Sequence, residues 1–285
     1  MKILVTGADG MLGKDLMAML SRDPEVMGVN RSGMDITDLD KVKDMIARYK
    51  PVVVVHTAAF TDVDGCESKP WDALRTNAVG TRNVSLACME VDAAMLYVST
   101  DYVFSGAKAA PYTEWDTPDP INLYGQSKYA GEIAVKDHLR KFFIVRTSGL
   151  YGRHGKSFIQ SILHAAHDKP ELTVVNDQIS LPTYSRDLAD AISRLVKTKH
   201  YGTYHITNTH ENFGISWHDW AALILRETGM ANVRLTPITS AQLNRPARRP
   251  PYSALGNTFF YLRDFPTMRP CHEALTAFLK EVGLK

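Results

Sequence analysis

The chain has 285 residues, of which 45% are hydrophobic and 22% charged, the composition of an ordinary globular protein. A net charge of +2, from 33 basic and 31 acidic residues, gives no reason to expect nucleic acid or an anionic membrane as a partner. The sequence has no run of eighteen apolar residues, and its N-terminal apolar stretch is too short for a signal peptide. We therefore expect a cytoplasmic protein. Three widely spaced cysteines show no metal-ligand pattern: Cys66, Cys88 and Cys271.

A strand, a glycine turn and a helix are predicted in direct succession at the N-terminus. Lys2–Thr6 is a short apolar run that predicts a buried strand, and apolar residues recur at helical spacing over 12–20. Between them lies Gly7-x-x-Gly10-x-x-Gly13. In this context glycines permit a tight turn, a close approach of the backbone to a pyrophosphate, and close packing of helix on strand. We therefore predict a dinucleotide site, with the N-terminus of the helix facing the phosphates.

The second predicted strand is Glu25–Val29. In dinucleotide-binding proteins, the residues that follow this strand distinguish NAD from NADP. A carboxylate at this point binds the ribose 2′-hydroxyl of NAD, whereas an arginine suits the 2′-phosphate of NADP. The chain has Arg31 and no carboxylate there, which favours NADPH, with NADH as the alternative. The competing interpretation of Arg31 is a solvated loop residue.

The third predicted strand, Val52–Val55, is continuously β-branched, as expected for a strand covered on both faces. A helix that begins after Thr37 or Asp38 as its N-cap precedes this strand. Two small residues, Ala58 and Ala59, follow it and would let a flat ring lie against the strand end.

A helix is predicted from about Ala73 to Val91, followed by a fourth strand at Met95–Val98. Thr100 follows that strand, where its hydroxyl could bind a substrate carbonyl or could be an ordinary strand-end group. The preceding stretch, 60–70, is expected to be a loop. It contains three carboxylates, which we interpret as helix-capping or solvated groups rather than a metal site: Asp62, Asp64 and Glu67.

A tyrosine and a lysine four residues apart are the candidates for chemistry. Prolines before Asn122 disfavour helix, and a helix is predicted from Leu123 to about Leu139. Because positions four apart share one helix face, the phenol of Tyr124 and the ammonium of Lys128 can point into the same space. A nearby cation lowers the pKa of a tyrosine, which is ~10 when free, so the pair would act as a tuned proton donor or acceptor.

Beyond a fifth strand at Phe142–Arg146 and a glycine-containing loop over 147–155, the alternation of strands and helices becomes less regular. Periodicity predicts four more helices and two more strands, namely helices over 157–167, 185–197, 217–228 and 271–282, and strands over 172–175 and 204–207.

Two groups of large side chains in this second half carry competing interpretations. Trp217 and Trp220 share one face of a predicted helix, which favours core packing. Arg245, Arg248 and Arg249 lie in a proline-rich loop. Their guanidinium groups match phosphate geometry, and a solvated loop is the alternative.

Three motifs in this order resemble the extended short-chain dehydrogenase/reductases: the glycine turn, Ser99-Thr100-Asp101-Tyr102-Val103-Phe104, and Tyr124-x-x-x-Lys128. Within them the chain is most similar to the dTDP-4-dehydrorhamnose reductases. Weaker matches span nearly the whole chain: Arg146-Thr147-Ser148, Leu150-Tyr151-Gly152, Asn176-Asp177-Gln178, Pro182-Thr183-Tyr184 and Arg245-Pro246-Ala247-Arg248-Arg249-Pro250.

The resemblance implies an α/β fold, a Rossmann-like doubly wound parallel sheet with a smaller C-terminal α/β lobe. Residues 1–150 and about 183–205 would form the dinucleotide-binding domain. Residues of about 151–182 and 206–285 would form the lobe that binds the sugar nucleotide. The implied reaction is NADPH- or NADH-dependent reduction of the C4 ketone of dTDP-4-dehydro-L-rhamnose to dTDP-L-rhamnose. The partner is then a dTDP-linked 4-keto-6-deoxy sugar, and the protein a monomer or homodimer.

The resemblance also assigns roles to residues. Thr100 would polarise the ketone, Tyr124 would deliver the proton, and Lys128 would hold the nicotinamide ribose and lower the pKa of the tyrosine. The substrate set is completed by three residues: Asp101, Gly149 and Arg248. The cofactor set, besides Tyr124 and Lys128, comes from the glycine turn and the strand ends: Gly7, Gly10, Met11, Leu12, Gly13, Arg31, Asp35, Ile36, Ala58, Ala59 and Phe60.

The chain departs from the family pattern at Gly149, where a tryptophan usually packs beside the sugar. We expect its loss to enlarge the pocket. Asp15 matches one acidic position of the magnesium-dependent dimers that some members form, but the other positions have no match, so no metal is predicted. Two different functions stay open. One is that of another nucleotide-sugar 4-ketoreductase, epimerase or dehydratase, and the second is that of a non-catalytic subunit like the regulatory subunit of methionine adenosyltransferase.

Overall fold

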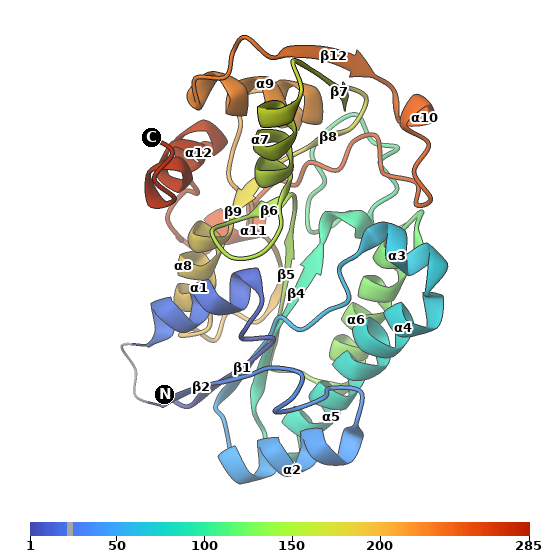
Figure 1. Cartoon of the computed structure of the whole chain (residues 1–285). Coiled ribbons are helices and arrows are strands. Elements are labelled where there is room, and N and C mark those ends of the chain that lie inside the picture. Colours follow the sequence, from blue (N-terminus) through green and yellow to red (C-terminus); the bar gives the residue numbers. More distant parts are fainter. Residues whose placement is uncertain (22–24) are drawn as a thin grey trace.

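The structure is a computed structural model that describes residues 1–21 and 25–285. A six-stranded parallel sheet forms its centre, in the order β10-β5-β4-β3-β1-β2 (Figure 1). The strand order reverses between β1 and β3, and in such sheets a ligand-binding crevice lies beyond the carboxyl ends of the strands at that point. The predicted doubly wound sheet is confirmed, with strands β1 Ile3–Thr6, β2 Val26–Val29, β3 Val53–His56, β4 Ala94–Thr100, β5 Phe142–Thr147 and β10 Gly202–His205.

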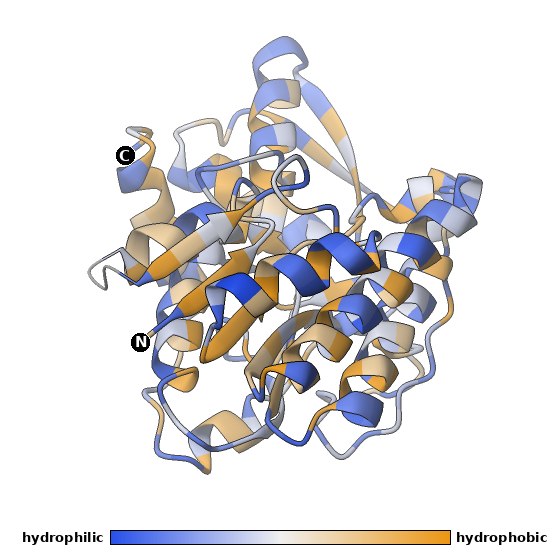
Figure 2. Cartoon of the chain, turned by 90° about the horizontal axis from the view of Figure 1, so that it is seen from below, coloured by the Kyte–Doolittle hydropathy of each residue, from blue (hydrophilic) through white to orange (hydrophobic). Residues whose placement is uncertain are grey.

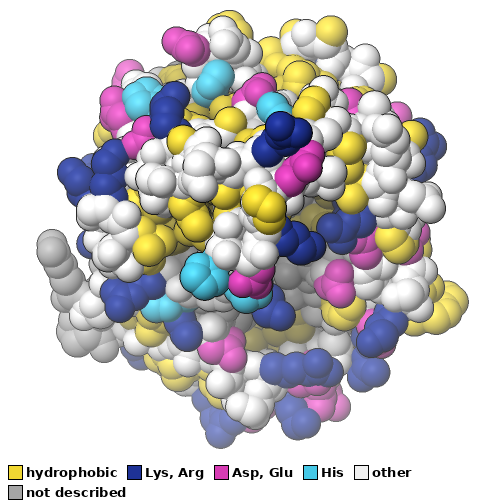
Figure 3. All heavy atoms as spheres, turned by 45° about the horizontal axis from the view of Figure 1, so that its top comes forward, with side chains coloured by type: hydrophobic (Ala, Val, Ile, Leu, Met, Phe, Trp, Pro, Cys, Tyr) yellow, Lys and Arg dark blue, Asp and Glu magenta, His cyan; other side chains and the backbone are white. Residues whose placement is uncertain are grey.

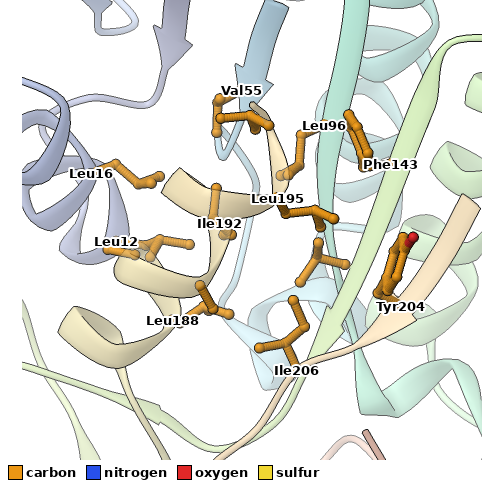
Figure 4. Close-up of a cluster of buried hydrophobic side chains, with 14 of the residues drawn as sticks. Leu12, Leu16, Val55, Leu96, Phe143, Leu188, Ile192, Leu195, Tyr204 and Ile206 are labelled. Carbon is orange, nitrogen blue, oxygen red and sulfur yellow. The ribbon is translucent and has the colours of Figure 1, made fainter. Parts of the chain in front are cut away.

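Helices cover both faces of this sheet. Neighbouring strand residues point to opposite sides, so each face has apolar side chains that a layer of helices buries. Val5 packs into the core on one face, whereas Leu4 packs into the core on the other. Figure 4 shows leucines of two helices lying on the sheet, and Figure 2 shows apolar strands between helices of mixed hydropathy. The first face carries α1 Met11–Leu20 and α8 Ser185–Leu195, and the second carries α2 Leu39–Tyr49, α5 Thr81–Glu90 and α6 Leu123–His138.

The prediction of a loop over 60–70 is wrong. Asp62 accepts a hydrogen bond from the N–H of Gly65 (2.9 Å) and caps the six-residue helix α3, Val63–Ser68. A helix this short shows no recognisable periodicity of apolar residues. The helix expected over 73–91 is present in three parts: α4 Pro70–Leu74, a π-helical stretch Arg75–Gly80, and α5.

A second core lies beyond the carboxyl ends of the strands, at the top of Figure 1. Trp220 packs there against Tyr151, as predicted for a core tryptophan. The helices around it are α7 Phe158–Asp168, α9 Trp217–Glu227 and α12 Cys271–Glu281, near the expected ranges. The strand predicted over 172–175 is β7 Glu171–Val175, which pairs with β12 Arg234–Ile238. Apart from β7, the small sheets and short helices were not indicated by periodicity: β12, β6 Leu150–Tyr151 with β9 Thr183–Tyr184, β8 Ile179–Ser180 with β11 Ile215–Ser216, α10 Ser240–Leu243 and α11 Thr258–Tyr261.

Residues of about 183–205, which are expected in the dinucleotide-binding domain, include α8, which packs on α1, and β10, which pairs with β5. The exact boundaries of the two lobes stay a prediction. Charged side chains of both signs are interspersed on the face shown in Figure 3, in keeping with the small net charge. Among the helices of the described residues, none combines the length and apolar character needed to cross a membrane.

Candidate active site

A cavity of about 720 Å³ lies beyond the carboxyl ends of β1, β3, β4 and β5. It is continuous from the glycine turn to the second core, so one ligand can span both lobes. Of the predicted site residues, only Arg248 is outside its lining. Those that line it are Gly7, Gly10, Met11, Leu12, Gly13, Arg31, Asp35, Ile36, Ala58, Ala59, Phe60, Thr100, Asp101, Tyr124, Lys128 and Gly149.

The glycine turn forms a cradle that larger residues would fill. Gly7 has φ +68°, and a Cβ atom there would lie 2.8 Å from the backbone nitrogen of Ala58. A Cβ atom on Gly13 would overlap the carbonyl oxygen of Gly7. No side chain caps α1, which begins after Gly10, so its first N–H groups have no partner within the helix. These features fit a pyrophosphate at the N-terminus of α1.

Arg31 lies at the edge of the cavity beside Asp35. Its side chain is 89% exposed, and its Nε is 3.7 Å from a carboxylate oxygen of Asp35. A hydrogen bond from the backbone of Thr37 lowers the pKa of Asp35, which therefore stays ionised and holds the guanidinium near the cavity. The geometry leaves most of the guanidinium available to a phosphate.

Tyr124 is placed by the capped first turn of α6. The side chain of Asn122 accepts a hydrogen bond from the N–H of Gly125 (2.8 Å), and Glu67 accepts one from the N–H of Leu123 (2.9 Å). A Cβ atom at position 125 would overlap the carbonyl oxygen of Tyr102, so only glycine lets the helix come this close to the end of β4. The phenol of Tyr124 consequently lies near Thr100, whose hydroxyl acts to lower the pKa of the phenol.

The pKa values of the pair differ from the sequence-based expectation. Burial raises the pKa of Tyr124, and the nearby hydroxyl of Thr100 partly opposes this rise. The Nζ of Lys128 donates to the carbonyl oxygen of Val98 (2.7 Å) and lies 4.2 Å from the ring centre of Tyr97. Burial lowers the pKa of Lys128 to about 7. The group that lowers the pKa of Tyr124 is therefore Thr100 and not Lys128. The ammonium group of Lys128 instead contacts Val98 and Tyr97.

Asp101 is a buried carboxyl group encircled by hydroxyls. One oxygen accepts from Thr100 (3.0 Å), and the other accepts from Ser148 (3.0 Å) and Ser253 (2.5 Å). Burial raises its pKa to about 6 in spite of these three donors. The last residues of β4 and β5 are paired, which brings Ser148 beside Asp101, whereas Ser253 arrives from the C-terminal segment.

Trp217 packs against the second core, as predicted, but it also lines the cavity next to Gly149, which the prediction of core packing did not include. Gly149 has φ +53°, and a Cβ atom there would lie 3.5 Å from Cη2 of Trp217. The indole packs on Phe158, with ring centres 4.6 Å apart. Trp217 is the first residue of α9, at the end of the helix that faces the cavity. An indole is therefore present in this wall of the cavity although position 149 lacks one.

The remaining polar and apolar groups of this wall had no spacing signal in the sequence. They come from segments far apart in the chain and meet only in the fold. Besides Trp217, the lining includes Thr147, Ser148, Gln178, Ile179, Ser180, Pro250 and Ser253.

The arginine-rich loop does not bring its guanidinium groups into the cavity lining. Arg249 and Arg245 both pair with the carboxylate of Asp64, at 2.5 and 3.3 Å. The side chain of Arg248 is exposed, and its carbonyl oxygen accepts a hydrogen bond from Asn122 (2.8 Å). Asp64, expected to be a capping or solvated group, is the ion-pair partner of this loop.

Within residues 1–21 and 25–285, no three His, Cys, Asp or Glu side chains are grouped as they would be around a metal ion. Asp15, which matched an acidic position of the family, accepts a hydrogen bond from Ser185.

Comparison with known proteins gives a consistent result. The model of the family described as RmlD substrate binding domain matches residues 1–284. A dTDP-4-dehydrorhamnose reductase of Streptomyces griseus is 40% identical over 280 residues, covering 96% of this chain and 91% of the relative. A dTDP-4-keto-6-deoxy-D-glucose reductase of Streptomyces niveus is 37% identical, covering 96% and 94%. The crystal structure of dTDP-4-dehydrorhamnose reductase from Bacillus anthracis in complex with NADP superimposes with a TM-score of 0.95 at 38% identity, covering 99% of this chain and 100% of that one.

Proposed function

The chain belongs to the RmlD substrate binding domain family, and we propose that it reduces the C4 ketone of dTDP-4-dehydro-L-rhamnose with NADPH, giving dTDP-L-rhamnose. One observation carries this proposal. A glycine cradle fit for a pyrophosphate shares a single cavity with Thr100, Tyr124 and Lys128. A dinucleotide and a carbonyl group bound there would meet at the carboxyl end of β4. The relatives named for this reaction and the NADP-bound structural neighbour support the same substrate and cofactor.

The residues present fit a nicotinamide dinucleotide. The free N–H groups of Met11, Leu12 and Gly13 would bind the pyrophosphate, and Arg31 would bind the 2′-phosphate of NADPH. The small residues after β3 leave room for the flat middle of the cofactor, and Lys128 would bind the nicotinamide ribose. When bound, the cofactor supplies the hydride that reduces the ketone carbon. NADH is the alternative donor.

Tyr124 supplies the proton of the reaction. Its raised pKa keeps the phenol protonated at neutral pH, as a proton donor requires. As negative charge develops on the ketone oxygen, the phenol of Tyr124 donates its proton to that oxygen, and the hydroxyl of Thr100 turns its hydrogen bond from Asp101 to the same oxygen. These interactions are strongest where charge appears in the transition state, so they accelerate the chemical step.

Because Gly149 lacks the tryptophan that usually packs beside the sugar, a second 4-keto-6-deoxy sugar is the main rival substrate. The relative from Streptomyces niveus is named for reduction of dTDP-4-keto-6-deoxy-D-glucose, a different sugar with the same reacting group. Incubation with each sugar and NADPH, followed by identification of the product sugar, tests the assignment. We expect faster NADPH oxidation with dTDP-4-dehydro-L-rhamnose.

The same assay distinguishes reduction from epimerisation, from dehydration and from binding without catalysis. An epimerase or dehydratase would convert the sugar with no net NADPH oxidation, and a non-catalytic subunit would bind NADPH and convert neither sugar. We infer further that the protein acts in the cytoplasm as a monomer or homodimer, with no nucleic acid or membrane partner.

A further inference from the structure

Residues 245–253, here called the strap, cross from the C-terminal lobe to the nucleotide-binding half of the molecule. The strap is hydrogen-bonded at three points, to α3, to the N-cap residue of α6 and to the residue that follows β4. These are Ala247 N–H to Asp64 (3.1 Å), the Asn122 side chain to the carbonyl of Arg248 (2.8 Å), and the Ser253 hydroxyl to Asp101 (2.5 Å). The strap therefore contacts residues that adjoin both elements carrying Thr100 and Tyr124.

The strap is attached most strongly by a bidentate ion pair between Arg249 and Asp64. The Nη1 and Nη2 atoms of Arg249 lie 2.5 and 2.8 Å from the two carboxylate oxygens of Asp64. The side chains are only 14% and 22% exposed. A planar guanidinium group can donate two parallel hydrogen bonds to a carboxylate, which fixes the orientation of the two side chains as well as the distance between them. Arg249 holds the pKa of Asp64 at about 2, so this contact stays ionised across the pH range of enzyme assays.

The ion pair continues to the catalytic tyrosine through Tyr102. The charge of Arg249 also reaches the hydroxyl of Tyr102 and opposes the rise that burial causes in the pKa of this phenol. The ring of Tyr102 packs edge-to-face on the ring of Tyr124, with centres 6.0 Å apart and planes at 78°. The carbonyl of Tyr102 also lies against the backbone of Gly125 in the first turn of α6. Tyr124 thus has on one side a ring whose hydroxyl lies near the guanidinium group of the strap.

We propose that Asp64 and Arg249 are positioning residues, which hold Tyr102 against Tyr124 and so couple the C-terminal lobe to the geometry of proton transfer. This inference rests on the proposed function, since it takes Tyr124 as the proton donor. It assigns the arginine-rich loop to orientation of the catalytic tyrosine rather than to binding of the substrate phosphates. Arg249 itself touches no reacting atom, because it lies outside the cavity lining.

Kinetics of three variants test the proposal. Asp64→Asn, Arg249→Gln and Tyr102→Phe should each lower kcat about 10- to 100-fold, because small displacements of a catalytic group have effects of this size. KM for the sugar nucleotide and for NADPH should change less than about threefold. The double variant of Asp64→Asn with Arg249→Gln should be no slower than the slower single variant, since both remove the same contact. Arg245→Gln is the matched control, because Arg245 binds the same carboxylate from an exposed position (57% exposed), and we expect near wild-type kcat.

Two outcomes would overturn the proposal. If Arg249 bound the substrate phosphates, Arg249→Gln would raise KM for the sugar nucleotide at unchanged kcat, and Asp64→Asn would not. If the pair served stability alone, the variants would melt at lower temperature but keep wild-type kcat per folded molecule.

A spectroscopic readout separates failure of this proposal from failure of the proposed function. In protein with ¹³C-labelled tyrosine, Asp64→Asn should shift the ring signals of Tyr102 and Tyr124, and Arg245→Gln should not. This result requires no turnover, so it holds even for a chain that reduces neither sugar. Unchanged ring signals in Asp64→Asn would refute the positioning role.

Discussion

The two ends of the cavity are built in different ways. The end proposed to bind the nucleotide is built mostly from three short stretches of the chain, 7–13, 30–37 and 57–61. The sugar end consists of side chains that converge from distant parts of the chain, among them Ser148, Trp217 and Ser253. A dinucleotide offers the same pyrophosphate to every protein, so backbone N–H groups suffice to bind it. A particular sugar has to be distinguished by side chains, and Thr100, Tyr124 and Lys128 lie where the two ends meet.

Removing the proposed proton donor, Tyr124, at that meeting point should have the largest effect. We expect Tyr124→Phe to fold, to bind NADPH as tightly as the wild type, and to lose about 100- to 10,000-fold in kcat, because the general acid is gone. Single-turnover rates and NADPH titration by fluorescence measure the two quantities. Turnover within about threefold of wild type would remove Tyr124 from the mechanism.

At the nucleotide end the sensitive feature is space. A Cβ atom on Gly13 overlaps the carbonyl of Gly7, so Gly13→Ala has to distort the cradle. We expect NADPH binding to weaken at least tenfold and stability to fall by about 1–3 kcal/mol. Gly33→Ala is the control, because its Cβ atom would come no closer than 3.6 Å to the side chain of Asn30. Equal NADPH affinity in both variants would mean that the cradle does not bind the cofactor.

At the sugar end the sensitive feature is the indole of Trp217. Trp217→Ala should raise KM for the sugar nucleotide about tenfold, since an aromatic contact of this kind contributes about 1 kcal/mol or more, while NADPH affinity stays unchanged. Trp71→Ala, at a position 80% exposed on α4, controls for loss of a tryptophan. A shift in NADPH affinity with no change in KM for the sugar would place Trp217 at the other end of the cavity.

The smallest effect is expected from Arg31, at the outer edge of the nucleotide end. Arg31→Asp should shift the ratio of kcat/KM for NADPH over NADH by about fivefold towards NADH, because solvent screens a side chain this exposed. Steady-state kinetics with both cofactors measure the ratio. A ratio equal to that of the wild type would show that Arg31 does not bind the 2′-phosphate.

The same contrast explains what could be predicted from the sequence. The glycine turn occupies seven consecutive positions between a strand and a helix, and Tyr124 and Lys128 are one helical turn apart, so local spacing revealed both. Ser253 and Asp101 are separated by 152 positions, and Arg249 and Asp64 by 185, so no local pattern connects them.

Trp217 and Trp220 show what local reasoning misses at a helix end. Both lie on the apolar face of α9, which predicts core packing for both. Trp220, one turn further on, is buried in the second core, whereas Trp217, the first residue of the helix, packs at the edge of that core and also lines the cavity. The expected lowering of the Tyr124 pKa by Lys128 is wrong for a related reason. Spacing along the helix indicates only the neighbours on that helix, whereas burial and Thr100, on another element, determine this pKa.

The most direct test of the account is the stoichiometry of the reaction with dTDP-4-dehydro-L-rhamnose. NADPH oxidation and sugar product are to be quantified in the same sample, with Tyr124→Phe protein as the blank. The account predicts one NADPH oxidised for each dTDP-L-rhamnose formed, and almost none in the blank. Formation of a different sugar, or conversion of the substrate without NADPH oxidation, would contradict it.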